Sequence, residues 1–139
     1  MFYKVLINSM IILTTGCAAN TSTNNPIKLS QNVIGTYLND DGFGNNTNLV
    51  LNDDGSYQSS LEGKIGIYGF SSGIWSENES VISFLPSDES GVLKSSLKPM
   101  VIINKKDGFS LVPTQKIKLH NQLMADFGKS TYSFTLNKI

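Results

Sequence analysis

The sequence predicts an all-β fold, either a small antiparallel up-and-down barrel or a sandwich, with at most one short helix. Short apolar runs rich in Val, Ile, Tyr, Phe and Thr recur along the chain, and these residue types favour strands. Asp-Gly dipeptides separate several of the runs and favour tight hairpin turns. Only 16% of the residues are charged, which is too few for Glu- and Lys-rich helices. A chain of 139 residues has room for one such domain.

Residues 1–16 predict a secretory signal peptide. A lysine precedes an apolar stretch, residues 5–13, and small residues follow up to the only cysteine. The stretch is too short to cross a bilayer, which takes about 20 apolar residues. The run Thr14-Thr15-Gly16-Cys17 resembles the lipobox of bacterial lipoprotein precursors at three of its four positions. The departure is Thr14, because the leucine usual at that position stands one place earlier.

The lipobox resemblance implies cleavage after Gly16, acylation of Cys17 and attachment of the mature chain to a lipid bilayer. Ala18 differs from the Asp that resembles an inner-membrane retention signal. We therefore expect a location at the bacterial outer membrane, facing the periplasm or the exterior. The alternative is that Cys17 is simply a small apolar residue of a leader. Because the sequence contains no second cysteine, it offers no intramolecular disulfide.

Residues 17–31 predict a flexible tether, because they carry few apolar side chains that could offset chain entropy. The folded domain is expected over residues 32–139. Within it, apolar residues recur at every second position, as in half-buried strands, and the pairs Leu49 and Leu51, Ile65 and Ile67, and Ile82 and Phe84 are each expected on one face. The same alternation runs through Tyr132, Phe134 and Leu136. Strands are expected at residues 32–38, 47–52, 55–61, 64–70, 72–76, 80–85, 99–103, 109–113, 116–120 and 130–136.

Residues 120–130 are the one segment whose pattern is compatible with a helix. Leu123, Met124 and Phe127 recur at helix-like spacing, and Gly128 is a stop signal. Eight to ten antiparallel strands with no long helix favour a closed barrel or a sandwich, which removes or shortens exposed sheet edges.

A family resemblance rests on the order of four motifs, and it covers about residues 33–86. Residues 35–37 (GTY), 49–57 (LVLNDDGSY), 71–76 (SSGIWS) and 81–86 (VISFLP) together resemble the lipocalin-like barrels of small bacterial envelope lipoproteins. The nearest likeness is the N-terminal domain of the NlpE-type copper-resistance and envelope-stress lipoproteins. That family carries a Cys-x-x-Cys after the first strand, which is absent here, so copper binding is not carried over. The Gly-x-Trp of true lipocalins lies on the first strand, whereas Gly73-Ile74-Trp75 lies in mid-chain.

Four aromatic residues are the candidate ligand-binding residues: Tyr37, Tyr57, Tyr68 and Trp75. An aromatic ring at a barrel mouth can stack on an apolar ligand. The alternative is that these rings fill the core, which is the more frequent role of a single Trp in a strand.

No motif predicts an enzyme, a metal site or a cofactor. His120 is the only histidine and has no Cys, Asp or Glu at metal-ligand spacing, and no serine lies in a Gly-x-Ser-x-Gly motif. The pairs Asp40/Asp41 and Asp53/Asp54 could supply calcium ligands, but their place in hairpin turns explains them as well. All basic residues other than histidine are lysines, which disfavours nucleic-acid recognition because that function usually relies on arginine.

The charges are unevenly distributed along the chain. Residues 39–89 hold most of the acidic residues and a single lysine, Lys64, while residues 94–138 hold most of the lysines. In a meander such halves become two faces, which could steer a charged partner; the alternative is an accidental asymmetry. We expect a membrane-anchored, non-catalytic binding module for a small apolar ligand or an envelope protein. An inhibitor or immunity-type lipoprotein that neutralises an enzyme through a charged face is the alternative.

Overall fold

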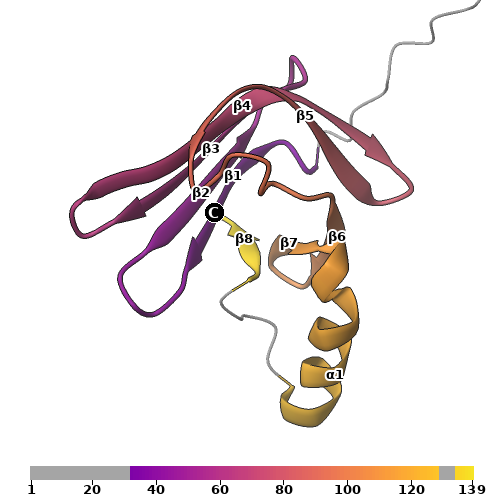
Figure 1. Cartoon of the computed structure of the whole chain (residues 1–139). Helices are drawn as coiled ribbons and strands as arrows, with labels where there is room; N and C mark the ends of the chain where they lie inside the picture. Colours follow the sequence, from indigo (N-terminus) through magenta and orange to yellow (C-terminus); the bar gives the residue numbers. More distant parts are fainter. Residues whose placement is uncertain (1–31, 129–133) are drawn as a thin grey trace, which may run out of the picture.

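The computed structural model describes residues 32–128 and 134–139 (Figure 1). Within them, eight antiparallel strands follow one another around a closed barrel, and the last strand pairs with the first. This confirms the predicted all-β up-and-down barrel with one short helix. The predicted signal peptide, Cys17 and the tether all lie outside the described residues, as does Tyr132.

The strands differ greatly in length, from 3 to 13 residues. A 3-10 turn, η1 (Thr114–Lys116), and the helix α1 (Ile117–Phe127) lie between the last two strands. The strands are β1 (Gly35–Asp40), β2 (Asn46–Leu51), β3 (Ser56–Gly63), β4 (Gly66–Asn78), β5 (Val81–Gly91), β6 (Met100–Lys105), β7 (Gly108–Pro113) and β8 (Leu136–Lys138).

Aspartate side chains shape the predicted hairpin turns. The Asp41 carboxylate accepts hydrogen bonds from the Phe43 and Asn45 backbone N–H groups at 2.7 and 3.1 Å, and from the Asn45 side-chain amide at 2.6 Å. Asp54 accepts one from the Ser56 N–H at 2.8 Å. Hydrogen bonds from the Asn45 side chain and the Phe43 N–H stabilise the charged Asp41 and hold its pKa below the ordinary value. Hydrogen bonds from the Ser56 side chain and N–H lower the pKa of Asp54 in the same way. Asp41 and Asp54, two of the four loop aspartates that could supply calcium ligands, therefore stabilise the turns in which they lie.

The inward side chains of the barrel form a continuous core. Aliphatic residues from five strands, together with Val33 just before β1, pack with three aromatic side chains, so the barrel interior is filled by protein. Polar groups in the core find partners there: the Tyr37 hydroxyl donates to the Val33 carbonyl oxygen at 2.7 Å. The buried members are Val33, Tyr37, Leu49, Leu51, Tyr57, Trp75, Ile82, Met100, Leu111 and Leu136.

Three expectations about local structure are wrong. The strands expected at 64–70 and 72–76 form one long strand, β4. The second error concerns two predicted strands: residues 116–120 are part of η1 and α1, and Phe134 and Thr135, from the strand expected at 130–136, precede β8. Pro113 ends β7. Ile117, His120 and Leu123 then share one face of α1, although the alternation within residues 116–120 resembles that of a strand. The helix ends where expected, because Gly128 adopts φ +64 and donates its N–H to the Met124 carbonyl oxygen.

The third error concerns Ile65 and Ile67, which were expected on a buried face. Their side chains are 87% and 67% exposed. Neighbouring strands do not cover them, because β2 pairs with β3 only as far as Glu62 and β5 pairs with β4 only as far as Gly69. The tip of the β3–β4 hairpin thus projects beyond the barrel wall.

Candidate functional site

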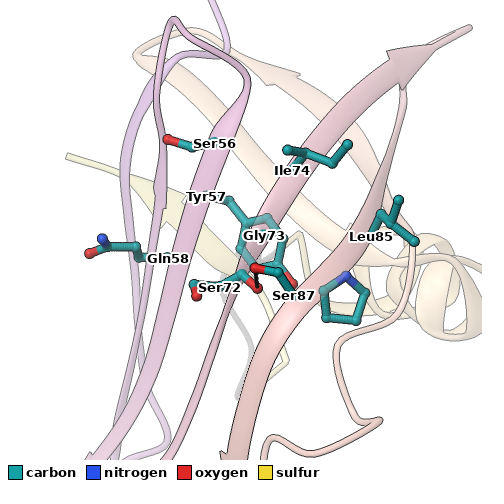
Figure 2. Close-up of a pocket in the computed structure, with 9 residues that line it drawn as sticks. Ser56, Tyr57, Gln58, Ser72, Gly73, Ile74, Leu85 and Ser87 are labelled. Carbon is teal, nitrogen blue, oxygen red and sulfur yellow. Dashed lines mark hydrogen bonds between the residues drawn. The ribbon is translucent and has the colours of Figure 1, made fainter.

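The outer face of β3, β4 and β5 carries a hollow of about 470 Å³, which we call the β3–β5 groove (Figure 2). Ligand sites commonly begin at about 300 Å³, so the groove can accept a substantial group. Its nine lining residues come from three consecutive strands of the barrel wall. They are Ser56, Tyr57, Gln58, Ser72, Gly73, Ile74, Leu85, Pro86 and Ser87.

A β-bulge creates the groove. Ser72 pairs with Asp88 and Gly73 pairs with Pro86, so Ser87 is an extra residue on β5. Such a bulge bends a strand and increases its twist. Pro86 suits this place because it has no N–H to contribute to a ladder. The Ser87 hydroxyl donates a hydrogen bond to the Ser72 carbonyl oxygen at 3.2 Å, and this bond ties the bulged residue of β5 to β4.

Gly73 forms the floor of the groove and must lack a side chain. A Cβ atom there would lie 2.1 Å from the Leu85 carbonyl oxygen and 2.8 Å from the Pro86 Cα. Both neighbours are backbone atoms, which cannot move aside cheaply. The close approach of β4 and β5 therefore depends on glycine at this position.

Two aliphatic side chains form the apolar part of the groove. Ile74 and Leu85 are paired directly across β4 and β5, and they are 58% and 66% exposed. Figure 2 shows the polar side chains of Ser56, Gln58 and Ser72 to one side of this pair. The lining has no carboxylate, lysine or histidine. This set of groups can bind by apolar contact and uncharged hydrogen bonds, and it offers no acid–base pair for catalysis.

Tyr57 is the one candidate residue that borders the groove, from its inner side. Its ring is buried and packs edge-on against the Phe84 ring, with 4.9 Å between the two ring centroids. Its hydroxyl shares a 2.8 Å hydrogen bond with the Ser71 hydroxyl. Ser71 in turn donates to Glu89 at 3.4 Å. Burial raises the pKa of the Tyr57 phenol. Tyr57 thus supports the wall behind the groove.

The structure does not bring the other candidate aromatics to the groove. Trp75 is 4% exposed and donates its indole N–H to the Asn52 carbonyl oxygen, and Tyr37 is fully buried. Tyr68 lies partly exposed on the β3–β4 hairpin, with its ring over Gly63. Ile74 is not among the residues predicted from the sequence, although strand alternation beside an inward Trp75 indicates an outward Ile74.

A second hollow of about 420 Å³ lies beside β1, β2 and β3. Asn39 lines it and donates its side-chain amide to the Thr135 carbonyl oxygen at 2.7 Å. Two carboxylates, Asp40 and Glu62, also line it. Across residues 32–128 and 134–139, no group of three or more His, Cys, Asp or Glu side chains is placed to hold a metal ion.

His120 is buried on the inner face of α1. Burial, and secondly the positive charge of Lys105, lower the pKa of the imidazole. Lys105 itself donates to the Asn137 side-chain oxygen at 2.7 Å, and burial lowers its pKa. The only histidine therefore belongs to the packing of α1 against the barrel.

Searches of protein-family models, curated proteins and solved structures found no match to this chain. None of the helices in the described part of the chain is long and apolar enough to cross a membrane.

Proposed function

We propose that this protein is a lipid-anchored, non-catalytic binding module of the bacterial envelope, and that the β3–β5 groove binds a protein partner. The observation that carries the proposal is the exposed pair of Ile74 and Leu85, set in a hollow whose lining is free of charged groups. Centres of protein interfaces are depleted in charged residues and combine apolar anchors with a polar rim. The groove has this composition.

A protein partner suits the groove better than a small apolar ligand does. Small-ligand sites usually bury most of the ligand surface, whereas this hollow lies on the outside of the barrel and its apolar walls remain largely exposed. The interior, where lipocalin-like proteins would hold a ligand, is packed with core side chains. A side chain presented by a partner could fill the hollow while neighbouring partner residues cover its rim.

The anchor and the envelope location are supported by the sequence of the leader. The lipobox at residues 14–17 precedes a polar segment, and the barrel begins after it. Resemblance of residues 33–86 to the NlpE-type lipoproteins favours the same location. Palmitate should label the full chain and not its Cys17→Ser variant, and equal labelling of both, or of neither, would contradict the anchor.

The groove is tested with a photoreactive amino acid in place of Ile74 in the full chain expressed in cells. Asn78, exposed on the same strand, is the matched control position. We expect one adduct from position 74, with the partner identified by mass spectrometry and its binding reproduced with purified proteins. The adduct should disappear when Leu85→Asp is added. Equal adducts from both positions, or none from position 74, would remove the groove as the site.

Native mass spectrometry of the same full chain tests the small-ligand alternative. A bound small molecule that is lost in Leu85→Asp would replace the protein partner by a small apolar ligand. Absence of an added mass, together with the crosslink, supports the partner.

The charge distribution favours a second candidate, an inhibitor or immunity-type lipoprotein. Strands β1–β5 are consecutive neighbours in the barrel, and the acidic residues of positions 39–89 lie on these strands and their turns. Most lysines of the described residues follow β5 in the chain, on the segment before β6 and on β6, η1, α1 and β8. Complementary charge steers association and is screened by salt. If the partner binds this way, pull-down should fail at high salt, whereas groove binding should persist.

A further inference from the structure

Three neighbouring connections expose large apolar side chains at one end of the barrel. Phe43 is 85% exposed in the β1–β2 loop, Ile65 and Ile67 are 87% and 67% exposed at the β3–β4 turn, and Val92 is 56% exposed after β5. We call these four residues the apolar tip. In an up-and-down barrel, the connections after β1, β3 and β5 all lie at the same end.

Direct contacts show that these connections adjoin one another. A Cβ atom at Gly44 would lie 2.8 Å from Lys64 Cε, so the β1–β2 loop touches the β3–β4 turn. The Val92 N–H donates to the Tyr68 carbonyl oxygen at 3.0 Å, which ties the chain after β5 to the same hairpin. Figure 1 shows both hairpins turning on the side of the barrel away from α1.

We propose that the apolar tip inserts into the surface of a lipid bilayer, the one that carries the anchor. The inference rests on the proposed lipid anchor. The four side chains stand on three separate connections, two of which also contain a lysine, and they project outward. A fluid lipid surface accepts such separate protrusions without a complementary pocket.

The charges beside the tip favour an electrically neutral lipid surface. Lys64 and Lys94 are balanced locally by Asp41 and Glu62, so no excess positive charge draws the tip to anionic lipids. Asp41 directs its carboxylate to N–H groups of its own loop. Lys64 precedes Ile65 and can keep its ammonium among the headgroups while its methylenes lie along the apolar surface.

The tether is long enough for this arrangement. The chain enters the barrel at the opposite end, where the Asn32 carbonyl oxygen accepts a hydrogen bond from Lys138. The longest strand, β4, has 13 residues and spans roughly 40 Å. Residues 17–31 can extend to at most roughly 50 Å. Once the anchor is inserted, contact of the tip with the same bilayer is intramolecular, which favours a weak second attachment.

Fluorescence quenching tests the insertion directly. The acylated full chain is reconstituted in phosphatidylcholine vesicles with brominated acyl chains, which quench tryptophan that enters the bilayer. Phe43→Trp places a reporter in the tip, and Ile139→Trp is its control at the opposite end, where the native side chain is 75% exposed. Native Trp75 is buried and supplies the background. We expect loss of fluorescence for Phe43→Trp alone. No loss, or equal loss in both variants, would overturn the proposal.

A vesicle titration of the Cys17→Ser full chain keeps the test independent of the anchor. Adding Ile65→Ser and Ile67→Ser should lower the partition coefficient into phosphatidylcholine roughly tenfold, whereas adding Ile139→Ser should not. Unchanged partitioning, or binding that requires anionic lipid and disappears at high salt, would overturn the proposal. A concentration-dependent dimer in analytical ultracentrifugation would also overturn the proposal if Ile65→Ser and Ile67→Ser abolish it. The apolar tip would then join two copies of the chain.

Failure of the proposed anchor gives a different result. If the chain has no lipid anchor, the parent chain should float with vesicles no better than its Cys17→Ser variant. The difference in partition coefficient between the apolar-tip variant and the Ile139→Ser variant would still report on insertion of the tip.

Discussion

The indole Nε1 of Trp75 donates a hydrogen bond to the Asn52 carbonyl oxygen at 3.0 Å, and the Trp75 backbone N–H donates to the Gly55 carbonyl oxygen at 2.8 Å. Side chain and backbone of one residue thus tie β4 to the turn between β2 and β3. Trp75→Phe keeps much of the packing but leaves the Asn52 oxygen without this donor, and we expect it to lower the free energy of unfolding by about 2 kcal/mol.

Trp75→Ala should cost about 3–5 kcal/mol because it also leaves a cavity. Urea titrations followed by circular dichroism measure both losses. Tyr68→Phe is the control, since Tyr68 is only partly buried, and it should change stability by less than about 0.5 kcal/mol. A Trp75→Phe protein as stable as the parent would contradict the structural role of the bond.

Gly73→Ala should disturb the groove and the fold together. The added methyl group would lie 2.1 Å from the Leu85 carbonyl oxygen, so β4 and β5 must separate locally. We expect a loss of about 1–3 kcal/mol in the free energy of unfolding and loss of the Ile74 crosslink. Ser72→Ala is the neighbouring control, because it retains the backbone carbonyl that accepts from Ser87. Equal stability of the Gly73→Ala and Ser72→Ala proteins would show that the strands are not so closely packed.

His120 should make the fold less stable in mild acid. Burial and Lys105 hold the pKa of the folded imidazole below 6.5, so at lower pH the unfolded chain binds a proton that the folded chain does not. The free energy of unfolding should therefore be constant just above pH 6.5 and decrease as the pH falls from 6.5 towards the folded pKa. NMR titration of this single histidine and urea titrations between pH 5 and 7 measure the effect. A pH slope that survives in His120→Gln would assign the effect to another group.

Tyr37 should make the fold less stable in alkali. Burial, and secondly the charge of Glu77, raise the pKa of its phenol to about 12, against 10.0 for the free side chain. Between these values the unfolded chain has lost a proton that the folded chain retains, so this group lowers the free energy of unfolding by about 1.4 kcal/mol per pH unit. Tyr57, whose pKa is also raised, adds to the slope. Tyrosinate absorbance with urea titration should show a shallower slope in Tyr37→Phe, and an unchanged slope would refute the assignment.

The barrel could be predicted because its signals are local. Alternation such as Leu49 and Leu51, together with Asp-Gly turns, fixes strands and hairpins within a few residues of the chain. Alternation identifies a face but not how far a hairpin extends past its neighbours, and for this reason Ile65 and Ile67 were misplaced. It also cannot separate a ring in the core, such as Trp75, from one at a barrel mouth.

The groove could not be predicted for a related reason. It depends on a register shift at which Gly73 pairs with Pro86 and Ser87 becomes an extra residue. That shift is a property of two strands in contact, and neither strand shows it alone. Acylation of Cys17 remains a prediction from the sequence.

The closing strand β8 sets the time at which the barrel can be completed. It follows the other seven described strands in the chain and is only 3 residues long, yet it bridges β7 and β1, for example through the pairing of Tyr37 with Lys138. During synthesis from the N-terminus, the chain therefore presents an open sheet with two unpaired edges until β8 emerges. Chaperone binding or proteolysis would compete with folding during this interval, and chains cut before residue 136 would keep the two edges unpaired.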